Sequence, residues 1–380
     1  MRTGSVNKQQ KLLSSCSFSL CAAPPTGRGK KYKAEFQQTR EREAVEQKKL
    51  TSHCTAAFSF EDMRTASLLF LLSFLLGVNY SQAGSEFRIC AFNLHHFGES
   101  KAKKSDVMLT LARIISRCDV CLLQEVRDSK GTAVPQLIQT IKSYDHNHQY
   151  QHVASVRLGR SETYQEQYVF VYRSDTVTVT DQYQYPDDLP GDEDAFSREP
   201  FVVRLKAPRT AIKDFVLIAQ HTTPTNTTKE LDSLYDVLQR VRKMWKTENV
   251  MLLGDFNADC GYLAKKNRKN VRLITDPSLH WLVPENSDTT VKLSTSCSYD
   301  RIVVHGDTFN RAVVPSSAQP FNFQKEYKLT EEQALDISDH YPVEVLLRVV
   351  SSRAFPRGSS FKNHFSLFAF IPLVLQALLW

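Results

Sequence analysis

The chain has 380 residues, of which 42% are apolar and 23% are charged, so it can bury a large core and is not a disordered tail protein. Its 48 basic and 41 acidic residues give a net charge of +7. This excess lies at the two ends, because residues 84–350 carry 33 basic and 35 acidic side chains. The overall basicity therefore gives no argument for nucleic-acid binding.

Residues 63–83 have the pattern of a secretory signal peptide. Arg64 provides a basic flank, residues 66–78 are an apolar stretch, and residues 81–83 (SQA) offer small side chains for cleavage. A buried core helix is the alternative, but the stretch has no polar face. Upstream, residues 1–62 are rich in Lys, Arg, Gln, Ser and Thr without periodicity, and we expect a disordered segment or an extended start.

Residues 351–380 combine a spacer with a hydrophobic tail. The last 16 residues are apolar and uncharged, which is short for a membrane span, and small residues precede them. This pattern is typical of a glycolipid (GPI) anchor signal, with a tail anchor or an untethered secreted product as alternatives. We expect a protein of the secretory pathway, located at the endoplasmic reticulum and cell surface and anchored on the lumenal or extracellular side. The sequon at Asn226 predicts N-glycosylation on that route.

Five cysteines fall within residues 84–350, so at least one thiol should be free. Cys90, Cys118 and Cys121 lie in apolar, strand-like runs and are expected to be buried small hydrophobic side chains. A redox role for the Cys118-x-x-Cys121 spacing is the alternative. Cys260 and Cys297 lie in polar loops and are the candidates for a disulfide.

Residues 84–350 are expected to form one domain, because short β-branched and aromatic runs recur without an intervening linker. These runs predict strands at 87–92, 120–124, 168–172, 201–205, 215–220, 250–253, 301–304 and 343–349. Helical spacing of apolar residues predicts helices at 107–115 and 231–245. The alternation predicts an α/β layered architecture with helices covering the faces of the sheet.

Polar side chains stand at the ends of most predicted strands. Singly, such residues are usually turn residues. Together they are expected to converge, because strand ends in layered α/β folds share an edge. The set is Asn93, Glu125, His221, Asp255, Asn257, Asp300, Asp339 and His340.

This set of side chains favours metal-assisted hydrolysis. Its carboxylate and amide oxygens suit Mg²⁺, Mn²⁺ or Ca²⁺ better than zinc. Carboxylates near His221 and His340 would raise the pKa of both rings and orient them. A metal together with His/Asp pairs suits the attack of water on a phosphodiester.

Several segments resemble the deoxyribonuclease I family of the endonuclease/exonuclease/phosphatase superfamily. They are AFN at 91–93, LQEV at 123–126, GDFNADC at 254–260, YDR at 299–301 and SDHYP at 338–342. The resemblance extends from about residue 87 to residue 348. It implies an α/β fold, a four-layer α/β/β/α sandwich of two packed β-sheets with outer helices. It also implies an endonuclease that hydrolyses double-stranded DNA to 5′-phosphorylated products with little sequence specificity.

The resemblance also implies roles for individual residues and the cofactors Mg²⁺ and Ca²⁺, with Mn²⁺ as a possible substitute. The catalytic residues would be His221 and His340 as acid and base, Glu166 to orient His221, and Asp300 to pair with His340. The metal and phosphate ligands would be Glu125, Asn93, Asp255, Asn257 and Asp339. The DNA contacts would be Arg127, Tyr164 and Arg198.

The chain also departs from the family pattern. His95 occupies a position that is often Arg, and only the Cys260–Cys297 bridge is expected. The acidic residues Asp188 and Asp194, and separately Asp288, are candidates for structural Ca²⁺, with a solvated turn as the alternative. Actin binding is doubtful, and we expect a monomer. A basic cluster at residues 265–269 is expected either to follow DNA phosphates or to be a solvated loop.

Two other functions remain open. Relatives with the same site chemistry include phospholipid and inositol-phosphate phosphodiesterases or phosphatases, and a surface glycoprotein could bind nucleic acid without cleaving it. The nuclease is favoured because the site residues are all present, and because the Tyr-x-Glu segment at 164–166 and the SREP segment at 197–200 match the DNA-cutting branch.

Overall fold

The computed structural model describes residues 86–186 and 194–350. The predicted signal peptide at 63–83, the segment 1–62 and the tail at 351–380 lie outside these residues. None of the helices in the described part of the chain is long and apolar enough to cross a bilayer.

The first of two sheets contains β1 and β2, which are parallel, with antiparallel strands beside them. Its order is β12 (Gln319–Pro320), β13 (Val343–Leu347), β1 (Phe87–Phe97), β2 (Val120–Val126), β5 (Tyr164–Arg173) and β3 (Tyr150–Ala154), with β4 (Leu158–Ser161) paired to β5. A register shift interrupts the β1–β2 pairing between Asn93 and Phe97, and another interrupts the β2–β5 pairing between Leu123 and Val126. Both irregularities lie at the end of the sheet that carries the predicted site.

The second sheet is also mixed, because β8 and β9 are parallel and its other pairs are antiparallel. Its order is β10 (Leu279–Trp281), β11 (Asp300–His305), β9 (Val250–Asp255), β8 (Asp214–Ala219), β7 (Phe201–Lys206) and β6 (Thr178–Gln184). The adjacent strands β9 and β11 carry Asp255 and Asp300 at paired positions. The two carboxylates are therefore brought together by strand pairing.

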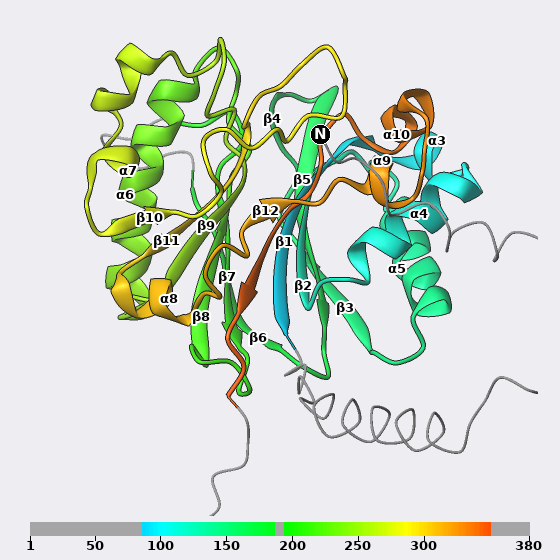
Figure 1. Cartoon of the computed structure of the whole chain (residues 1–380), viewed down its shortest axis with the longest axis horizontal. Helices are drawn as coiled ribbons and strands as arrows, with labels where there is room; N and C mark the ends of the chain where they lie inside the picture. Colours follow the sequence, from blue (N-terminus) through cyan, green and yellow to red (C-terminus); the bar gives the residue numbers. More distant parts are fainter. Residues whose placement is uncertain (1–85, 187–193, 351–380) are drawn as a thin grey trace, which may run out of the picture. The chain divides into compact units, whose positions relative to one another are not determined.

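Helices cover the outer face of each sheet (Figure 1). Over the first sheet lie α3 (Glu99–Ala102), α4 (Ser105–Ile115), α5 (Ala133–Tyr144), α9 (Phe323–Glu326) and α10 (Glu331–Ile337). Over the second lie α6 (Thr227–Trp245), η1 (Lys265–Asn270) and α7 (Arg272–Thr275), while α8 (Asp307–Ala312) follows β11. The predicted four-layer sandwich is confirmed.

The apolar strand runs are explained by burial on both faces. In β1, Ile89 and Ala91 belong to the core between the sheets, whereas Cys90 and Phe92 belong to the core under the helices. A central strand between two layers needs apolar side chains at every position, so it shows no alternation. The amphipathic helix α6 buries Leu234 on the outer face of the second sheet.

The predicted strands and helices all occur, with boundaries shifted by a few residues. The sequence patterns predict neither α5 nor the edge strands β3, β6 and β10. Strand β6 has no fully buried residue, so its sequence carries no apolar pattern. Helix α5 does have apolar residues at helical spacing, and Pro135 stands in its first turn, where proline is tolerated.

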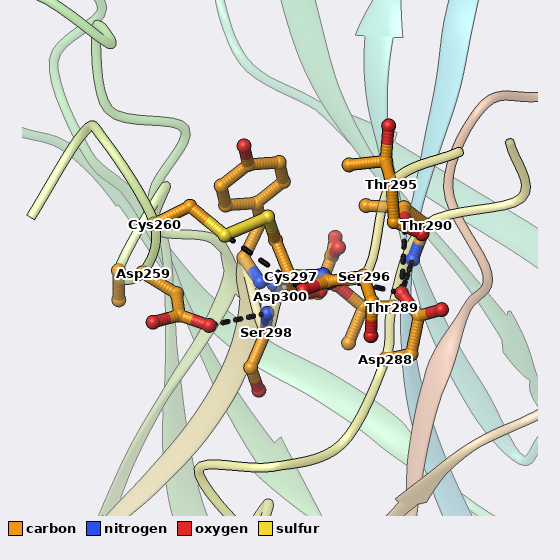
Figure 2. Close-up of a disulfide and its surroundings, with 12 residues drawn as sticks. Asp259, Cys260, Asp288, Thr289, Thr290, Thr295, Ser296, Cys297, Ser298 and Asp300 are labelled. Carbon is orange, nitrogen blue, oxygen red and sulfur yellow. Dashed lines mark hydrogen bonds between the residues drawn. A yellow bond between two sulfur atoms is a disulfide. The ribbon is translucent and has the colours of Figure 1, made fainter. Parts of the chain in front are cut away.

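Two disulfides are present in the described residues. The predicted Cys260–Cys297 bridge is found (Figure 2). The expectation that it would be the only one is wrong, because Cys90 is bonded to Cys118. Both of these cysteines are buried as predicted. Cys90 lies on β1, and Cys118 lies in the connection between α4 and the neighbouring strand β2. Cys121 is the buried free thiol, and burial raises its pKa.

Candidate active site

The predicted site residues of the two sheets meet at one edge of the sandwich. Asn93 on β1 donates through Nδ2 to Glu125 Oε1 at 3.0 Å within the first sheet. The same Nδ2 donates to Asp255 Oδ2 of the second sheet at 3.2 Å. Asn93 and Asp255 are almost fully buried, so these bonds form in a low-dielectric setting and hold the two sheets in fixed relation at the site.

Each histidine of the site has a buried carboxylate on its Nδ1 atom. His221 Nδ1 lies 2.7 Å from Glu166 Oε1, and His340 Nδ1 lies 2.7 Å from Asp300 Oδ2. A carboxylate in this position orients the ring and fixes the proton on Nδ1, which directs Nε2 toward the centre of the site.

The two Nε2 atoms converge on one carboxylate oxygen. Asp255 Oδ2 lies 3.5 Å from His221 Nε2 and 3.6 Å from His340 Nε2. The site is therefore nearly symmetric about Asp255, with an imidazole and a buried carboxylate on each side.

The surroundings of the two rings raise their pKa values to different extents. Burial and the nearby Arg198 lower the pKa of His221, but Glu166 and Asp255 outweigh them and the pKa lies above the ordinary 6.5. Burial also opposes protonation of His340, but Asp300 and Asp255 raise its pKa well above 6.5. Carboxylates stabilise the imidazolium form of both rings, and no arginine is among the main influences on His340.

Glu125 is held in its ionised form. Burial disfavours its charged form, but the positive ring of His221 and the hydrogen bond from Asn93 lower its pKa to about 2. Its backbone has a φ of 55°, in the left-handed region that only a few per cent of non-glycine residues adopt. This conformation coincides with the register shift in β2, so the irregular strand is what directs the carboxylate into the site.

Gln124, the residue before Glu125, has its side-chain amide fully buried between the sheets. Its Nε2 donates to the backbone oxygen of Gln220 at 2.8 Å, and its Oε1 accepts the backbone N–H of Asp255 at 2.9 Å. Gly254 makes room for this contact. A Cβ at this position would lie 2.3 Å from the Gln220 backbone oxygen and 2.6 Å from Gln124 Nε2. Gly254 also has a φ of 135°, which residues other than glycine rarely adopt.

Arg127 and Tyr164, two predicted DNA contacts, lie together at the exposed rim of the site. The Arg127 guanidinium stacks over the Tyr164 ring, 4.0 Å from its centroid. The Tyr164 hydroxyl lies 3.2 Å from His96 Nε2. The backbone N–H of His96 donates to Glu125 Oε2 at 3.0 Å. Through His96, this cluster connects the partly exposed Arg127 and the exposed Tyr164 ring to the Glu125 carboxylate.

Arg198, the third predicted DNA contact, is directed toward protein groups. Its Nε donates to the backbone oxygen of His221 at 3.0 Å, and its Nη2 donates to that of Thr222 at 2.9 Å. Nε also lies 3.2 Å from Glu166 Oε1, and the side chain is only 11% exposed. These contacts hold the backbone and the carboxylate partner of His221.

Asn257 and Asp339, two predicted metal and phosphate ligands, have different surroundings. Asn257 donates through Nδ2 to the backbone oxygen of Thr222 at 2.9 Å and through its N–H to Asp255 Oδ1 at 3.0 Å. Asp339 is 43% exposed, and its Oδ1 lies 3.8 Å from His95 Nδ1. That oxygen is buried and accepts no hydrogen bond from the described residues.

The donor set fits a hard divalent cation. Ligand atoms of Asp255, Asp300 and His340 lie within 4.8 Å of one another. Glu125 is held ionised, and Asp339 has a buried oxygen without a donor. A cation would supply the positive charge that this concentration of carboxylates lacks.

The calcium candidates have protein partners where they are described. Asp194 forms an ion pair with Arg160 at 3.0 Å. Asp288 Oδ1 accepts hydrogen bonds from the N–H and hydroxyl groups of Thr290 and from the Cys297 N–H, beside the Cys260–Cys297 disulfide (Figure 2). Asp188 lies outside the described residues. Structural calcium stays a prediction.

Sequence reasoning missed four side chains that support the site. Gln124 stood in a matched segment without an assigned role, although a polar side chain inside an apolar strand is a usable signal. Lys101 donates to the backbone oxygens of Leu94, His95 and Ile337, and so joins α3 to the segments on both sides of the site. Ser338, whose hydroxyl donates to the Asn93 backbone oxygen, also stood in a matched segment without an assigned role. His96 gives no sequence signal, since its contact with Glu125 depends on folding.

Comparisons with known proteins identify the family of the chain. The model of the Endonuclease/Exonuclease/phosphatase family matches residues 90–340. Deoxyribonuclease gamma of Rattus norvegicus is 49% identical over 287 residues, which are 75% of this chain and 92% of that protein. Deoxyribonuclease-1-like 1 of Mus musculus is 48% identical, over 71% of this chain and 83% of that protein. Deoxyribonuclease-1 of Sus scrofa is 47% identical, over 75% and 99%.

Among solved structures, the human nocturnin catalytic domain has a TM-score of 0.50 at 15% identity, covering 70% of this chain and 95% of that chain, and supports the fold alone. The apolar tail predicts that deoxyribonuclease-1-like 1 is the most similar member, but identities of 47 to 49% do not separate the three members. The family model spans most of the described domain and the relatives match 71 to 75% of the chain, so the chain belongs to the deoxyribonuclease I family of the endonuclease/exonuclease/phosphatase superfamily.

Proposed function

We propose that the chain is a divalent-metal-dependent endonuclease that hydrolyses double-stranded DNA to 5′-phosphorylated products with little sequence specificity. The observation that carries this proposal is the pair of imidazole–carboxylate units whose Nε2 atoms both face Asp255 Oδ2. Hydrolysis of a phosphodiester needs one group to take a proton from water and another to give a proton to the leaving oxygen. Two histidines on opposite sides of one centre can supply both.

The electrostatics favour one assignment of the two histidines. His221 faces Arg198 as well as carboxylates, so it is the more easily deprotonated ring and takes the proton from the attacking water. His340 faces Asp300 and Asp255, so it carries a proton that it gives to the O3′ leaving oxygen. Water oxygen bonds to phosphorus as the P–O3′ bond breaks, which leaves a 5′-phosphate and a 3′-hydroxyl.

The carboxylates and the amide of the site have a separate role. Glu125, Asp339 and Asn93 would hold Mg²⁺, which supplies positive charge beside the phosphate oxygens. Asn93 and Gln124 keep Glu125 and Asp255 in register across the two sheets. Arg127 and Tyr164 lie where they can contact the sugar-phosphate backbone, which carries no sequence information and so explains weak selectivity.

DNA is proposed as the substrate because the relatives described above are named deoxyribonucleases. The test is nicking of a supercoiled plasmid by the purified full chain with Mg²⁺ and Ca²⁺. We expect nicking that EDTA abolishes. His221→Ala and His340→Ala should each lose about 10²–10⁴-fold in rate with an unchanged fold by circular dichroism, because general acid and base groups contribute that much.

Three results would contradict the proposal. Near-wild-type nicking by both histidine variants would remove the assigned roles. A folded protein that nicks no DNA but hydrolyses a phospholipid or inositol phosphate would show that the same site serves another branch of the superfamily. Retained DNA binding without hydrolysis of any phosphoester would instead favour a binding protein.

We also propose that the protein follows the secretory pathway and is held at the membrane by its C-terminal tail. Two disulfides in the described domain support this, because disulfides persist in oxidising compartments. Release from intact cells by a phosphatidylinositol-specific phospholipase is expected for a glycolipid anchor. Retention on the membrane would favour a tail anchor, and recovery in the medium without treatment would contradict anchoring.

A further inference from the structure

We propose that the groove between α6 and η1, together with three lysines of η1, forms a second contact region for the DNA backbone beside the catalytic centre. This inference rests on the proposed function. The groove, called here the α6–η1 groove, has a volume of about 660 Å³. The residues used to define it are Thr225, Thr228, Lys229, Tyr262, Asn267 and Asn270.

The lining of the α6–η1 groove suits phosphate and sugar oxygens. Hydroxyl groups come from Thr225 and Thr228, amide groups from Asn267 and Asn270, and an ammonium group from Lys229. The one carboxylate of the lining, that of Asp232, is paired with Arg272 at 2.9 Å. Side chains of these types make most protein contacts to the nucleic-acid backbone. An apolar ligand would find few partners here.

Positive charge stands at the edge of the groove without a counter-charge. Lys265, Lys266 and Lys269 are exposed, and within the described residues none of them forms an ion pair. The acidic side chains of the region are bound to arginines instead. Arg272 binds Asp232 at 2.9 Å and Asp236 at 2.7 Å, and Arg268 binds Asp259 at 3.4 Å and Glu285 at 2.6 Å. The three lysines are therefore available to an external polyanion.

A continuous row of rings connects the groove to the catalytic centre. Tyr262, which lines the groove and is 43% exposed, packs against Tyr299 with ring centroids 5.2 Å apart. Tyr299 in turn lies 6.2 Å from the ring of His340. On the other side, the groove begins at Pro224, three residues after His221. A strand held between the two histidines therefore passes directly onto Tyr262 and the groove.

The test is binding rather than cleavage. A fluorescent duplex of about 30 base pairs is titrated with the full chain in EDTA, and the affinity is measured by anisotropy across a range of salt concentrations. All proteins carry Asn226→Gln, because Asn226 lines the groove and a glycan there would cover it. The Asn226 side chain makes no capping hydrogen bond with α6, so this change should be tolerated.

The main variant is Lys265→Gln/Lys266→Gln/Lys269→Gln. Log affinity falls as log salt concentration rises. Each lost phosphate contact makes this slope shallower by about 0.9, so the loss of three contacts makes it shallower by up to about 2.7. The matched control, Lys142→Gln/Lys213→Gln/Lys325→Gln, removes the same charge from exposed lysines elsewhere and should leave the slope nearly unchanged. Equal slopes in the two triple variants would overturn the proposal.

A second variant tests the groove itself. Asn270→Asp places a negative charge in the groove without removing a lysine and should weaken duplex binding, whereas Asn147→Asp on an exposed loop should not. Equal affinities would overturn the role of the groove. Failure of the proposed function would give a different result. The protein with an unsubstituted catalytic site would then not cleave DNA, and this would hold for any salt dependence of binding.

Discussion

The side-chain oxygen of Gln124 accepts a hydrogen bond from the backbone N–H of Asp255 at 2.9 Å, and this bond crosses from one sheet to the other. Gln124 precedes Glu125, and Asp255 faces both histidines. The same amide holds the backbone oxygen of Gln220, the residue before His221. One buried amide thus fixes the relative positions of a predicted metal ligand, a carboxylate and a histidine.

Gln124→Glu should lower both stability and activity. A carboxylate of the same shape cannot donate to the Gln220 oxygen and adds a buried charge near Asp255, which costs about 1–3 kcal/mol or more. Burial raises the pKa of the new carboxyl, so the loss of stability should be small at low pH, where the group is protonated and can donate, and should grow as pH rises.

Thermal unfolding at several pH values checks this prediction. Asn249→Asp is the matched control, because Asn249 also donates through its amide to a backbone oxygen, that of Asp214 at 3.0 Å, but at the opposite end of β9. Equal, pH-independent losses in the two variants would show that Gln124 has no special position.

Glu166→Gln should lower the pKa of His221. In the folded protein burial and Arg198 lower that pKa while Glu166 and Asp255 raise it. Removing the Glu166 charge leaves the lowering effects less opposed, so the ring should lose its proton at a lower pH. NMR titration of the histidine ring protons in the metal-free protein measures this, with His340, which pairs with Asp300, as the internal reference. An unchanged His221 titration would contradict the assigned pairing.

Removing either disulfide should destabilise the domain. The bonded cysteines are separated by 28 residues for Cys90–Cys118 and by 37 for Cys260–Cys297, and closing loops of this length stabilises by about 2–4 kcal/mol. Cys118→Ser and Cys297→Ser should therefore each lower the melting temperature and reduce the further effect of a reducing agent. Cys121→Ala, at the free thiol, is the control that should leave the response to reductant intact.

Glu125→Gln should abolish stabilisation by divalent cations. If the wild-type carboxylates bind Mg²⁺ or Mn²⁺, the melting temperature rises with cation concentration, because a ligand that binds only the folded state stabilises it. The neutral amide should remove most of this rise. Glu162→Gln, at an exposed position, should retain it, and equal shifts in both variants would exclude Glu125 as a principal ligand.

The sequence predicted that the side chains of the site would gather at one sheet edge, but it did not predict their geometry. Asp255 follows one apolar run and Asp300 precedes another, so the position of both residues at a sheet edge could be inferred. The pairing of Cys90 with Cys118 could not, because apolar periodicity shows that both are buried but not that they face each other. The left-handed backbone conformation of Glu125 could not be predicted either. It depends on a register shift between β2 and β5, which arises only when the two strands pair.

The Cys260–Cys297 bridge covalently ties the segment that follows β9 to the segment that precedes β11 (Figure 2). Asp255 and Asn257 lie just before one half-cystine, and Asp300 lies just after the other. Reduction would therefore release the two flanks of the catalytic centre as well as destabilise the domain. If the protein hydrolyses DNA as proposed, a thiol-rich compartment would loosen this centre, so the redox state of the surroundings would itself limit where the proposed activity can act.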